Sequence, residues 1–508
     1  MYIAPNSHIY ILHNVRIDNT YANTIHFNSS AEQASYFQGL AKYSLSAYSY
    51  VRKDNAVRVE IRTENLYDCN YIMFQNTAFG SKWFYAFITN VEYINNETSS
   101  ITFEIDVMQT WYFDYTINAS FVEREHSSTD NPGDNLVPDN LELGEYVADD
   151  FDGTGHMGQY TYVAAATFDE NMDNAVGQEY GGIYSGLVYN TFADADDLNT
   201  FIEDATNAGK SDGIVSIFAM PSDFVTKSNS VTHYNITKTK SLTDIGGYTP
   251  KNKKLFTYPY NFLYVTNLSG MATAFPYENF STNDCQFSLI GDMSCNPQVF
   301  LTPLNYKGVS ANYNEKMSMD GFPQCAYTTD SFKAWLAQSG ASAGLTLVGG
   351  GAAVALATGP IGVIAGLGAI ASVVGQIYEH SIQPPQARGS QSNSAAVAAR
   401  IKDFAFMHTH IKPEFARIID EYWNMYGYPT HRVKVPNISN RPHWNYVKTI
   451  NVSITGSVPA DDMTKIKSIY DNGVTFWRYG NEVGNYSLDN SIGTNNLTEG
   501  GEGSGETE

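Results

Sequence analysis

Two carboxylates in one short stretch have the spacing for acid–base chemistry. In the segment FEID, Glu104 and Asp106 are two residues apart, so a strand would place both side chains on one face. Such a pair hydrolyses glycosidic bonds when the carboxyl groups are held at a defined separation with different pKa values. Because alternation in any sheet also produces such pairs, we interpret these two residues as structural, with a cell-wall hydrolase as the alternative.

Three other polar clusters raise the question of metal binding. His408 and His410 form the motif HTH, but no third ligand follows at a useful spacing, so we interpret them as a polar entry to a helix. The stretch DDFDG around Asp150 and Asp152 lacks the remaining ligands of a calcium loop and is interpreted as a solvated turn. The stretch DADD at 194–197 is interpreted as acidic charge at the start of a helix.

The sequence contains none of the common catalytic motifs that we looked for. It has no G-x-S-x-G motif, no paired Cys and His and no P-loop. Without a C-x-x-C pair, its four cysteines are interpreted as reduced core residues: Cys69, Cys285, Cys295 and Cys325. We therefore expect no catalytic residues, no metal site and no cofactor.

The charge of the chain limits its possible partners. The 508 residues carry a formal net charge of -23, whereas nucleic-acid binding depends on Lys and Arg neutralising phosphates. The chain is therefore not expected to bind DNA tightly. An acidic surface would, however, suit a channel through which DNA passes.

The pattern of residues predicts a mainly β, multi-domain protein. Residues 1–126 read as a β domain, with a hairpin formed by two long apolar runs around the turn NNETSS. Residues 127–330 read as β-rich middle domains, with recurring strands such as YTYVAAATF, GIVSIFAM and NFLYVTNL. One short helix is predicted there, at DADDLNTFIEDATNAG.

The last folded part, 401–490, is predicted to contain an amphipathic helix near 413–426 followed by strands. Pro413 suits the first helical position, and Gly427 suits the end. The apolar face is predicted to consist of five residues: Phe415, Ile418, Ile419, Tyr422 and Tyr426. The acidic, glycine-rich tail 491–508 is predicted to be disordered.

Residues 331–400 combine an apolar segment with a Pro- and Ser-rich strap. No charged residue occurs between Lys333 and Glu379, a run of about 45 residues, whereas one membrane-spanning helix needs about 20. Gly359 and Pro360 divide the most apolar part into two arms of about 18 residues each, which predicts a helical hairpin. The following stretch SIQPPQARGSQSNSAAVAAR reads as a flexible tether.

The hairpin is predicted to insert into a membrane only conditionally. Each arm gains about 2 to 4 kcal/mol from its large aliphatic side chains, and the many glycines offset much of this gain. Small-residue faces at Gly340-x-x-x-Gly344 and Gly362-x-x-x-Gly366 favour association of several copies. The alternatives are a buried core hairpin and a permanent anchor. The expected membrane-active residues are Gly344, Leu345, Leu347, Val348, Val354, Leu356, Pro360, Ile361, Val363, Ile364, Gly366, Leu367, Ile370, Val373, Val374 and Ile377.

Several separate blocks resemble one family in the same order along the chain. They are YIMFQNTAFGSKWFYAFITNVEYI, FEIDVMQTWYFD, FVEREH, YGYPTHRVKVPN with WNYVKT, and IYDNGVTFWRYGNEVGNYSLDN. Together they resemble the distal tail-knob or major tail tube proteins of small, short-tailed, phi29-like bacteriophages. The blocks cover about the first quarter and the last fifth of the chain, and the PPQ at 384–386 also fits the family pattern.

The resemblance implies a virion protein that forms a homohexameric ring closing the end of a tail tube. The N- and C-terminal β parts would form barrel- or sandwich-like tube walls, and the apolar segments would plug the lumen. During infection these segments would leave the tube, enter the lipids of the host cell membrane and form a channel for viral DNA, which passes without specific binding. Other tail proteins would be partners, and assembly would take place in the host cytoplasm.

Three rival functions differ from this one in class. A tail-associated hydrolase would use the carboxylate pair, and a carbohydrate-binding adhesin would use exposed aromatic side chains. A helical-hairpin toxin would also hide an apolar hairpin, but its pore domain would be mainly helical, unlike the pattern of this chain.

Overall fold

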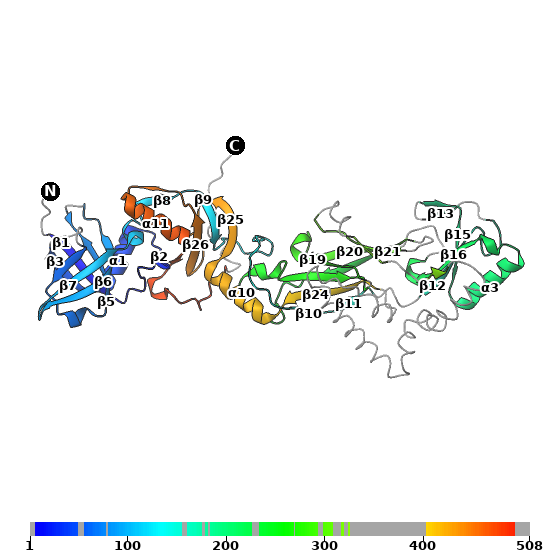
Figure 1. The fold of residues 1–508 in the computed structure, drawn as a ribbon, viewed down its shortest axis with the longest axis horizontal. Coiled ribbons are helices and arrows are strands. Elements are labelled where there is room, and N and C mark those ends of the chain that lie inside the picture. Colours follow the sequence, from blue (N-terminus) through cyan, green and yellow to red (C-terminus); the bar gives the residue numbers. More distant parts are fainter. Residues whose placement is uncertain are drawn as a thin grey trace, which may run out of the picture. The chain divides into compact units, whose positions relative to one another are not determined.

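A computed structural model describes the chain over residues 6–48, 55–77, 80–154, 160–174, 178–180, 183–225, 233–268, 270–292, 298–307, 316–319, 324–325 and 403–492. The chain divides into two compact units that interleave along the sequence (Figure 1). Unit 1 consists of Met1–Glu142, Tyr248–Leu255 and Glu414–Glu508, and unit 2 of Leu143–Gly247 and Phe256–Pro413. The two chain ends therefore belong to the same unit.

Unit 1 contains a six-stranded antiparallel sheet built from the N-terminal residues. Its strand order is β3-β1-β5-β6-β7-β4. The strands are β1 (Ser7–His13), β3 (Ala41–Tyr48), β4 (Ala56–Val59), β5 (Cys69–Gln75), β6 (Phe84–Asn95) and β7 (Thr98–Ile105). The predicted hairpin is confirmed as β6 and β7, but its second run ends at Ile105 because Asp106 caps a short helix, α2 (Val107–Thr110).

A second, five-stranded sheet of unit 1 joins segments from both chain ends. Its order is β2-β28-β26-β9-β25, and β2 runs parallel to β28. The strands are β2 (Asn23–Ile25), β9 (Ser120–Glu125), β25 (Tyr428–Lys434), β26 (Trp444–Ile450) and β28 (Val474–Trp477); β8 (Tyr115–Ile117) and β27 (Ile454–Gly456) form a separate pair. One hydrophobic core contains residues from both large sheets, including Tyr71, Trp444 and Trp477, together with Phe37 of the helix Ser30–Gly39.

Two helices of unit 1 lie where the sequence pattern predicted strands. Helix α1 (Ser30–Gly39) begins at Ser29, whose side chain accepts a hydrogen bond from the Glu32 backbone N–H at 3.2 Å. Helix α11 (Ala460–Asn472) has two acidic residues in its first turn and ends at Gly473, which has a φ of 95°. The strand prediction for these segments was wrong because the N-cap residue Ser29 and the acidic first turn of α11 favour helices within otherwise strand-rich stretches.

The predicted helix at 413–426 is confirmed as α10 (Pro413–Tyr426), but only Ile419 of the five residues of the predicted apolar face is buried. The residues that are buried are Ala416, Ile419, Asp420, Trp423 and Asn424, whereas Ile418 is 63% exposed. The helix is rotated relative to the purely apolar prediction because the Asp420 carboxylate accepts hydrogen bonds from the backbone N–H groups of Lys251 and Asn252, at 2.8 and 2.9 Å. A polar contact thus sets which face turns inward.

Unit 2 contains three larger sheets and a small hairpin. One sheet has the order β10-β24-β18-β19, with β11 also paired to β24; a second has the order β15-β12-β16-β23, and a third has the order β17-β20-β21-β22. Their strands are β10 (Tyr146–Ala148), β11 (Asp152–Gly153), β12 (Tyr160–Ala166), β15 (Val188–Phe192), β16 (Ile214–Pro221), β17 (His233–Thr239), β18 (Asn261–Thr266), β19 (Ala272–Pro276), β20 (Asp284–Asp292), β21 (Gln298–Pro303), β22 (Met317–Met319), β23 (Gln324–Cys325) and β24 (Ala405–Ile411); the hairpin is β13 (Gln178–Tyr180) with β14 (Ile183–Ser185). The mainly β prediction is confirmed, and its three quoted middle strands are β12, β16 and β18.

The predicted short helix of the middle region is confirmed as α3 (Ala195–Asn207). The Asp194 carboxylate accepts hydrogen bonds from the backbone N–H groups of Asp196 and Asp197 at 3.0 and 2.9 Å, which confirms that DADD begins a helix. Short 3-10 helices lie at Thr63–Leu66, Ser211–Gly213, Ser222–Phe224, Lys253–Phe256, Tyr277–Asn279 and Gly480–Glu482. Cys69 and Cys285 are buried free thiols, as predicted.

Gly427 allows α10 to end against β9. Its φ is +65°, and a Cβ at this position would lie 2.2 Å from the Glu125 carbonyl oxygen. We expect Gly427→Ala to lower the free energy of unfolding by about 2 kcal/mol or more, because the left-handed backbone and the close contact both disfavour a side chain. Urea denaturation would measure the loss, with Gly39→Ala as the control because a Cβ on Gly39 meets nothing within 4 Å. Equal stabilities for the two variants would contradict this account.

Candidate functional site

The expected membrane-active segment lies outside the residues that the structure describes. This includes all sixteen candidate residues between Gly344 and Ile377. Before the segment, the chain is last described in β23, where Cys325 pairs with Ile217 of β16. After it, the description resumes at Asp403, just before β24. Both flanking strands belong to unit 2. Among the described helices, none is long and apolar enough to cross a bilayer.

Strand β24 is held firmly after the segment. It pairs with β18 over six residues and with β10 and β11 on its other edge. The Asp403 carboxylate accepts hydrogen bonds from the backbone N–H groups of Phe404 and Thr154, at 2.8 and 3.3 Å. Phe404 and Phe406 are both buried in the core. The chain that follows the apolar segment therefore enters a central strand of a well-packed sheet.

His408 and His410 are strand residues, so the predicted helix entry is wrong. Alternating apolar residues in AFMHTHI pack on both faces of the sheet, which stabilises β24 here and delays the helix until Pro413. His408 Nδ1 lies 2.5 Å from the Tyr277 hydroxyl, and His410 Nε2 lies 2.8 Å from Asp149 Oδ2. Burial lowers the pKa of His408. Within the described part of the chain, no group of three His, Cys, Asp or Glu side chains is placed to hold a metal ion.

The acidic stretch DDFDG contributes to the same sheet. Asp152 lies in β11 and forms an ion pair with Lys238. Asp152 is solvent-exposed as predicted, but it lies in a strand and not in a turn, since β24 provides a pairing edge that the local sequence does not reveal.

The carboxylate pair of FEID is divided between surface and core. Glu104 forms an ion pair with Lys465, and this contact lowers the pKa of Glu104. Burial raises the pKa of Asp106 to about 6, and this side chain is only 1% exposed. Asp106 accepts hydrogen bonds from the Tyr71 hydroxyl at 2.8 Å and from the Gln109 backbone N–H at 3.1 Å. The two pKa values are shifted apart as in a glycosidase, but Asp106 caps α2 inside the core, where no substrate reaches it.

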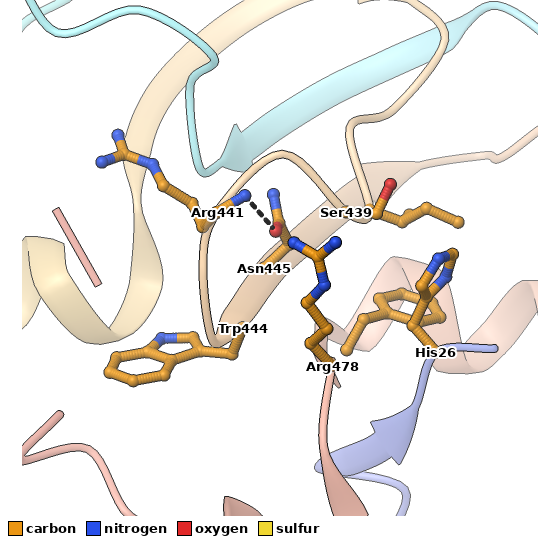
Figure 2. A pocket seen from close by; sticks show the side chains of 8 residues that line it. His26, Ser439, Arg441, Trp444, Asn445 and Arg478 are labelled. Atoms are coloured by element: carbon orange, nitrogen blue, oxygen red, sulfur yellow. Dashed lines mark hydrogen bonds between the residues drawn. The ribbon is translucent and has the colours of Figure 1, made fainter. Parts of the chain in front are cut away.

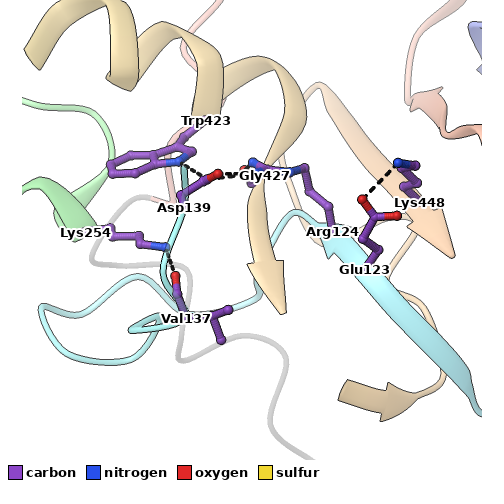
Figure 3. A network of polar contacts seen from close by, with 8 residues as sticks. All are labelled: Glu123, Arg124, Val137, Asp139, Lys254, Trp423, Gly427 and Lys448. Carbon is purple, nitrogen blue, oxygen red and sulfur yellow. Dashed lines mark hydrogen bonds and ion pairs between the residues drawn. The ribbon is translucent and has the colours of Figure 1, made fainter. Parts of the chain in front are cut away.

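A polar network in unit 1 binds together segments that are distant in sequence (Figure 3). Arg124 of β9 donates two hydrogen bonds to the Asp139 carboxylate, each at 2.7 Å, and one to the Gly427 carbonyl at 2.8 Å. Trp423 Nε1 of α10 donates to Asp139 at 2.9 Å. Lys254 Nζ donates to the Val137 carbonyl at 2.6 Å. Burial lowers the pKa of Lys254 to about 8. The network thus fixes the loop 130–142 and the return segment 248–255 beside α10.

A small cavity in unit 1 is lined by residues from both chain ends (Figure 2). Its volume is about 10 Å³, which is room for about one water molecule. The Arg441 backbone N–H donates to Asn445 Oδ1 at 2.9 Å beside it. A shallow surface depression of about 400 Å³ is lined by Tyr43, Glu60, Ile61, Arg62, Asn65 and Glu97. The cavity is too small for a sugar ring, and the depression is open and polar.

Two family models match the chain. The model for the C-terminal domain of the tail knob protein gp9 of Bacillus phage phi29 matches residues 222–491, which is more than half of the 508 residues. The model for the N-terminus of the caudoviral major tail protein matches residues 5–116. This chain belongs to the phi29 gp9 tail knob protein family. It is a structural component of a bacteriophage tail.

Individual relatives agree with the family models over nearly the whole length of this tail protein. The tail knob protein gp9 of Bacillus phage PZA is 25% identical, with 96% of this chain and 98% of the relative covered. The gp9 of Bacillus phage phi29 is also 25% identical at the same coverage. The solved tail knob protein gp12 of bacteriophage C1 shares the fold, with a TM-score of 0.60 and 15% identity over 94% of this chain and 97% of that one. The similarity therefore extends through the middle region, beyond the blocks recognised in the sequence.

The structural role of Asp106 can be tested through pH. Its pKa is about 6 in the folded protein against an ordinary 3.8, so its stabilising contribution is full below about pH 4 and is lost as the pH rises through about 6. Asp106→Asn removes this dependence. We expect the free energy of unfolding of the variant, relative to wild type, to rise by about 2 to 3 kcal/mol between acidic and neutral pH.

Urea titrations of both proteins at several pH values would measure this difference. The comparison is needed because buried His126, with a pKa lowered to about 3 from 6.5, acts in the opposite direction and loses stability as the pH falls. A difference between the two proteins that does not change with pH would contradict the assignment.

The Arg124–Asp139 pair can be tested by removing one charge. The two side chains are 12% and 9% exposed, so Asp139→Asn leaves a guanidinium that is poorly solvated and has lost its counter-charge. We expect a loss of about 2 to 4 kcal/mol in the free energy of unfolding. Asp134→Asn is a matched control, because exposed Asp134 only receives hydrogen bonds from Asn131. Similar losses of unfolding free energy in both variants would show that the Arg124–Asp139 pair does not stabilise unit 1.

Proposed function

We propose that six copies of this chain form a ring that closes the distal end of the phage tail, with the apolar segments plugging the lumen until infection. The segments then leave the lumen, insert together into the host cell membrane and form a channel through which DNA passes. One observation carries the proposal: a tail knob chain contains an uncharged run of about 45 residues, far more than the roughly 20 that one membrane span needs.

In this proposal the parts of the chain have different roles. Residues 1–126 and 401–490 build the tube wall, and 127–330 form the middle domains. Residues 331–400 are the membrane-active segment with its strap, and 491–508 are a disordered acidic tail. The shared core of the two chain ends supports a wall made from both, because neither sheet of unit 1 buries its apolar face without the other.

The energetics favour release of several segments together. An arm that gains about 2 to 4 kcal/mol on insertion, less the cost of its glycines, is only marginally stable alone in lipid. Six segments, with twelve arms in total, associate through their small-residue faces, which favours insertion as an assembly. The Pro- and Ser-rich strap would let the segment move while β24 stays in its sheet.

The acidic character of the chain supports passage of DNA without capture. With a net charge of -23 per copy, a lumen that carries part of this charge repels phosphates. Other tail proteins of the virion would bind the opposite end of the ring. The role is structural, since the paired carboxylates of FEID are used for capping and ion pairing in the described structure.

Vesicle leakage tests the membrane step. We expect the unassembled full chain, in which no lumen encloses the segment, to release entrapped dye from liposomes at acidic or neutral pH, and the deletion of 340–378 to release none. Ile370→Asp should also abolish leakage, because one carboxylate near the centre of a span costs about 2.5 to 3.5 kcal/mol, which cancels the gain of its arm.

Ile370→Leu is the matched control and should leak like wild type. Vesicles that stay sealed with the full chain at both pH values, or equal leakage by the deletion variant, would contradict the proposal.

A further inference from the structure

The β6–β7 hairpin of unit 1 extends beyond the rest of its sheet. Strand β5 pairs with β6 only from Phe84 to Phe87, whereas β6 continues to Asn95 in partnership with β7. Among the described residues, no strand pairs with the β5-facing edge of β6 beyond Phe87. We call residues 89–99 the arm. It presents a free strand edge.

The tip of the arm is both apolar and acidic. Tyr93 is 57% exposed, and Ile94 beside it is exposed as well. Glu92 and Glu97 are exposed, and neither forms an ion pair with another described residue. The tip is nevertheless ordered by its own hydrogen bonds, since the Tyr93 hydroxyl donates to Asn96 Oδ1 at 2.7 Å and the Glu97 N–H donates to Asn95 Oδ1 at 2.9 Å.

The five-stranded sheet of unit 1 presents a complementary surface at its edge strand, β25. Val433, Phe121 and Ile450 lie directly opposite one another on three adjacent strands, and all three are exposed, Val433 by 71%. The His431 ring stacks on Phe121, with centroids 6.2 Å apart. Arg432 next to it is exposed. We call these five residues the receiving face.

The receiving face has features of a surface that is covered in the assembled protein. It combines a free strand edge with a row of large apolar side chains, an arrangement that soluble monomers avoid. It also carries two basic residues in a chain of net charge -23, whereas the tip of the arm carries the carboxylates of Glu92 and Glu97. The two surfaces therefore match in apolar character, in charge and in strand edges available for pairing.

The arm and the receiving face of one chain lie at opposite ends of unit 1 (Figure 1). A chain therefore cannot satisfy its own receiving face. Contacts between two different surfaces of identical chains repeat head to tail and close into a ring when the rotation between copies allows it.

We propose that the arm of one copy docks on the receiving face of the next copy and adds strand β6 to the edge of β25. Tyr93 would lie beside Val433 and extend the row that Val433 forms with Phe121 and Ile450, while Glu92 would lie beside Arg432 on the other face of the enlarged sheet. This inference rests on the proposed ring and names the contact that builds it.

Complementary variants test this contact. The arm variant Glu92→Lys/Glu97→Lys keeps its receiving face, and the receiving variant Arg432→Glu/Val433→Asp keeps its arm. Each alone should associate at least about tenfold more weakly than wild type, because like charges then face each other. Mixed together, the two variants have opposite charges at both kinds of contact, so dimers and larger species should reappear. Analytical ultracentrifugation of the full chains would measure the species.

The control is Ile418→Asp, which changes a 63% exposed aliphatic residue on α10 and should associate like wild type. Circular dichroism would verify that each variant is folded. A wild-type chain that stays monomeric at its highest soluble concentration, variants that assemble normally, or a mixture without dimer would each overturn the inference. If both variants assemble normally, the proposed contact is wrong, but the proposals of a ring and of a membrane channel still stand. Vesicles that stay sealed would refute only the proposed channel.

Discussion

The structure of unit 1 depends on buried carboxylates that must receive hydrogen bonds from distant parts of the chain. Asp420 of α10 is 1% exposed and is satisfied by backbone groups of the return segment 248–255. Asp130 accepts from the Tyr428 hydroxyl at 2.6 Å and from the Lys253 N–H at 3.1 Å, and Asp139 accepts from Arg124 and Trp423. An unsatisfied carboxylate in a core costs several kcal/mol. These contacts therefore hold together the separate segments of unit 1, between which the chain passes through unit 2.

This anchoring fits a tail protein whose membrane-active part is proposed to move while its scaffold stays folded. The scaffold combines a shared aromatic core with polar contacts that fix each crossing segment. The apolar segment, by contrast, is uncharged and rich in glycine, so a single segment is unfavourable in water and only marginally stable in lipid. In the proposed mechanism, the segment has similar free energies in the lumen and in the membrane. A signal at infection can therefore shift the equilibrium from one location to the other.

The sequence predicted the elements whose local signals agreed with their packing. The β6–β7 hairpin and α10 were found because turn and cap residues mark their ends, but the face of α10 was misjudged because Asp420 is buried by partners remote in sequence. Helices α1 and α11 were missed although Ser29 and the acidic first turn of α11 are ordinary start signals. The histidines of β24 could not be placed, since their partners, Tyr277 and Asp149, are far away in the chain. The membrane-active residues remain a prediction, and the receiving face became visible only once strands from both chain ends lay side by side.

The central claim is that the apolar segments close the lumen of a ring of identical chains. Electron cryomicroscopy of the assembled full chain and of an assembly lacking 340–378 tests it most directly. The account predicts six-fold rings in both samples, with density across the lumen in the full chain and an open lumen in the deletion. Rings whose lumens are the same in the two samples, or an assembly without six-fold symmetry, would contradict it.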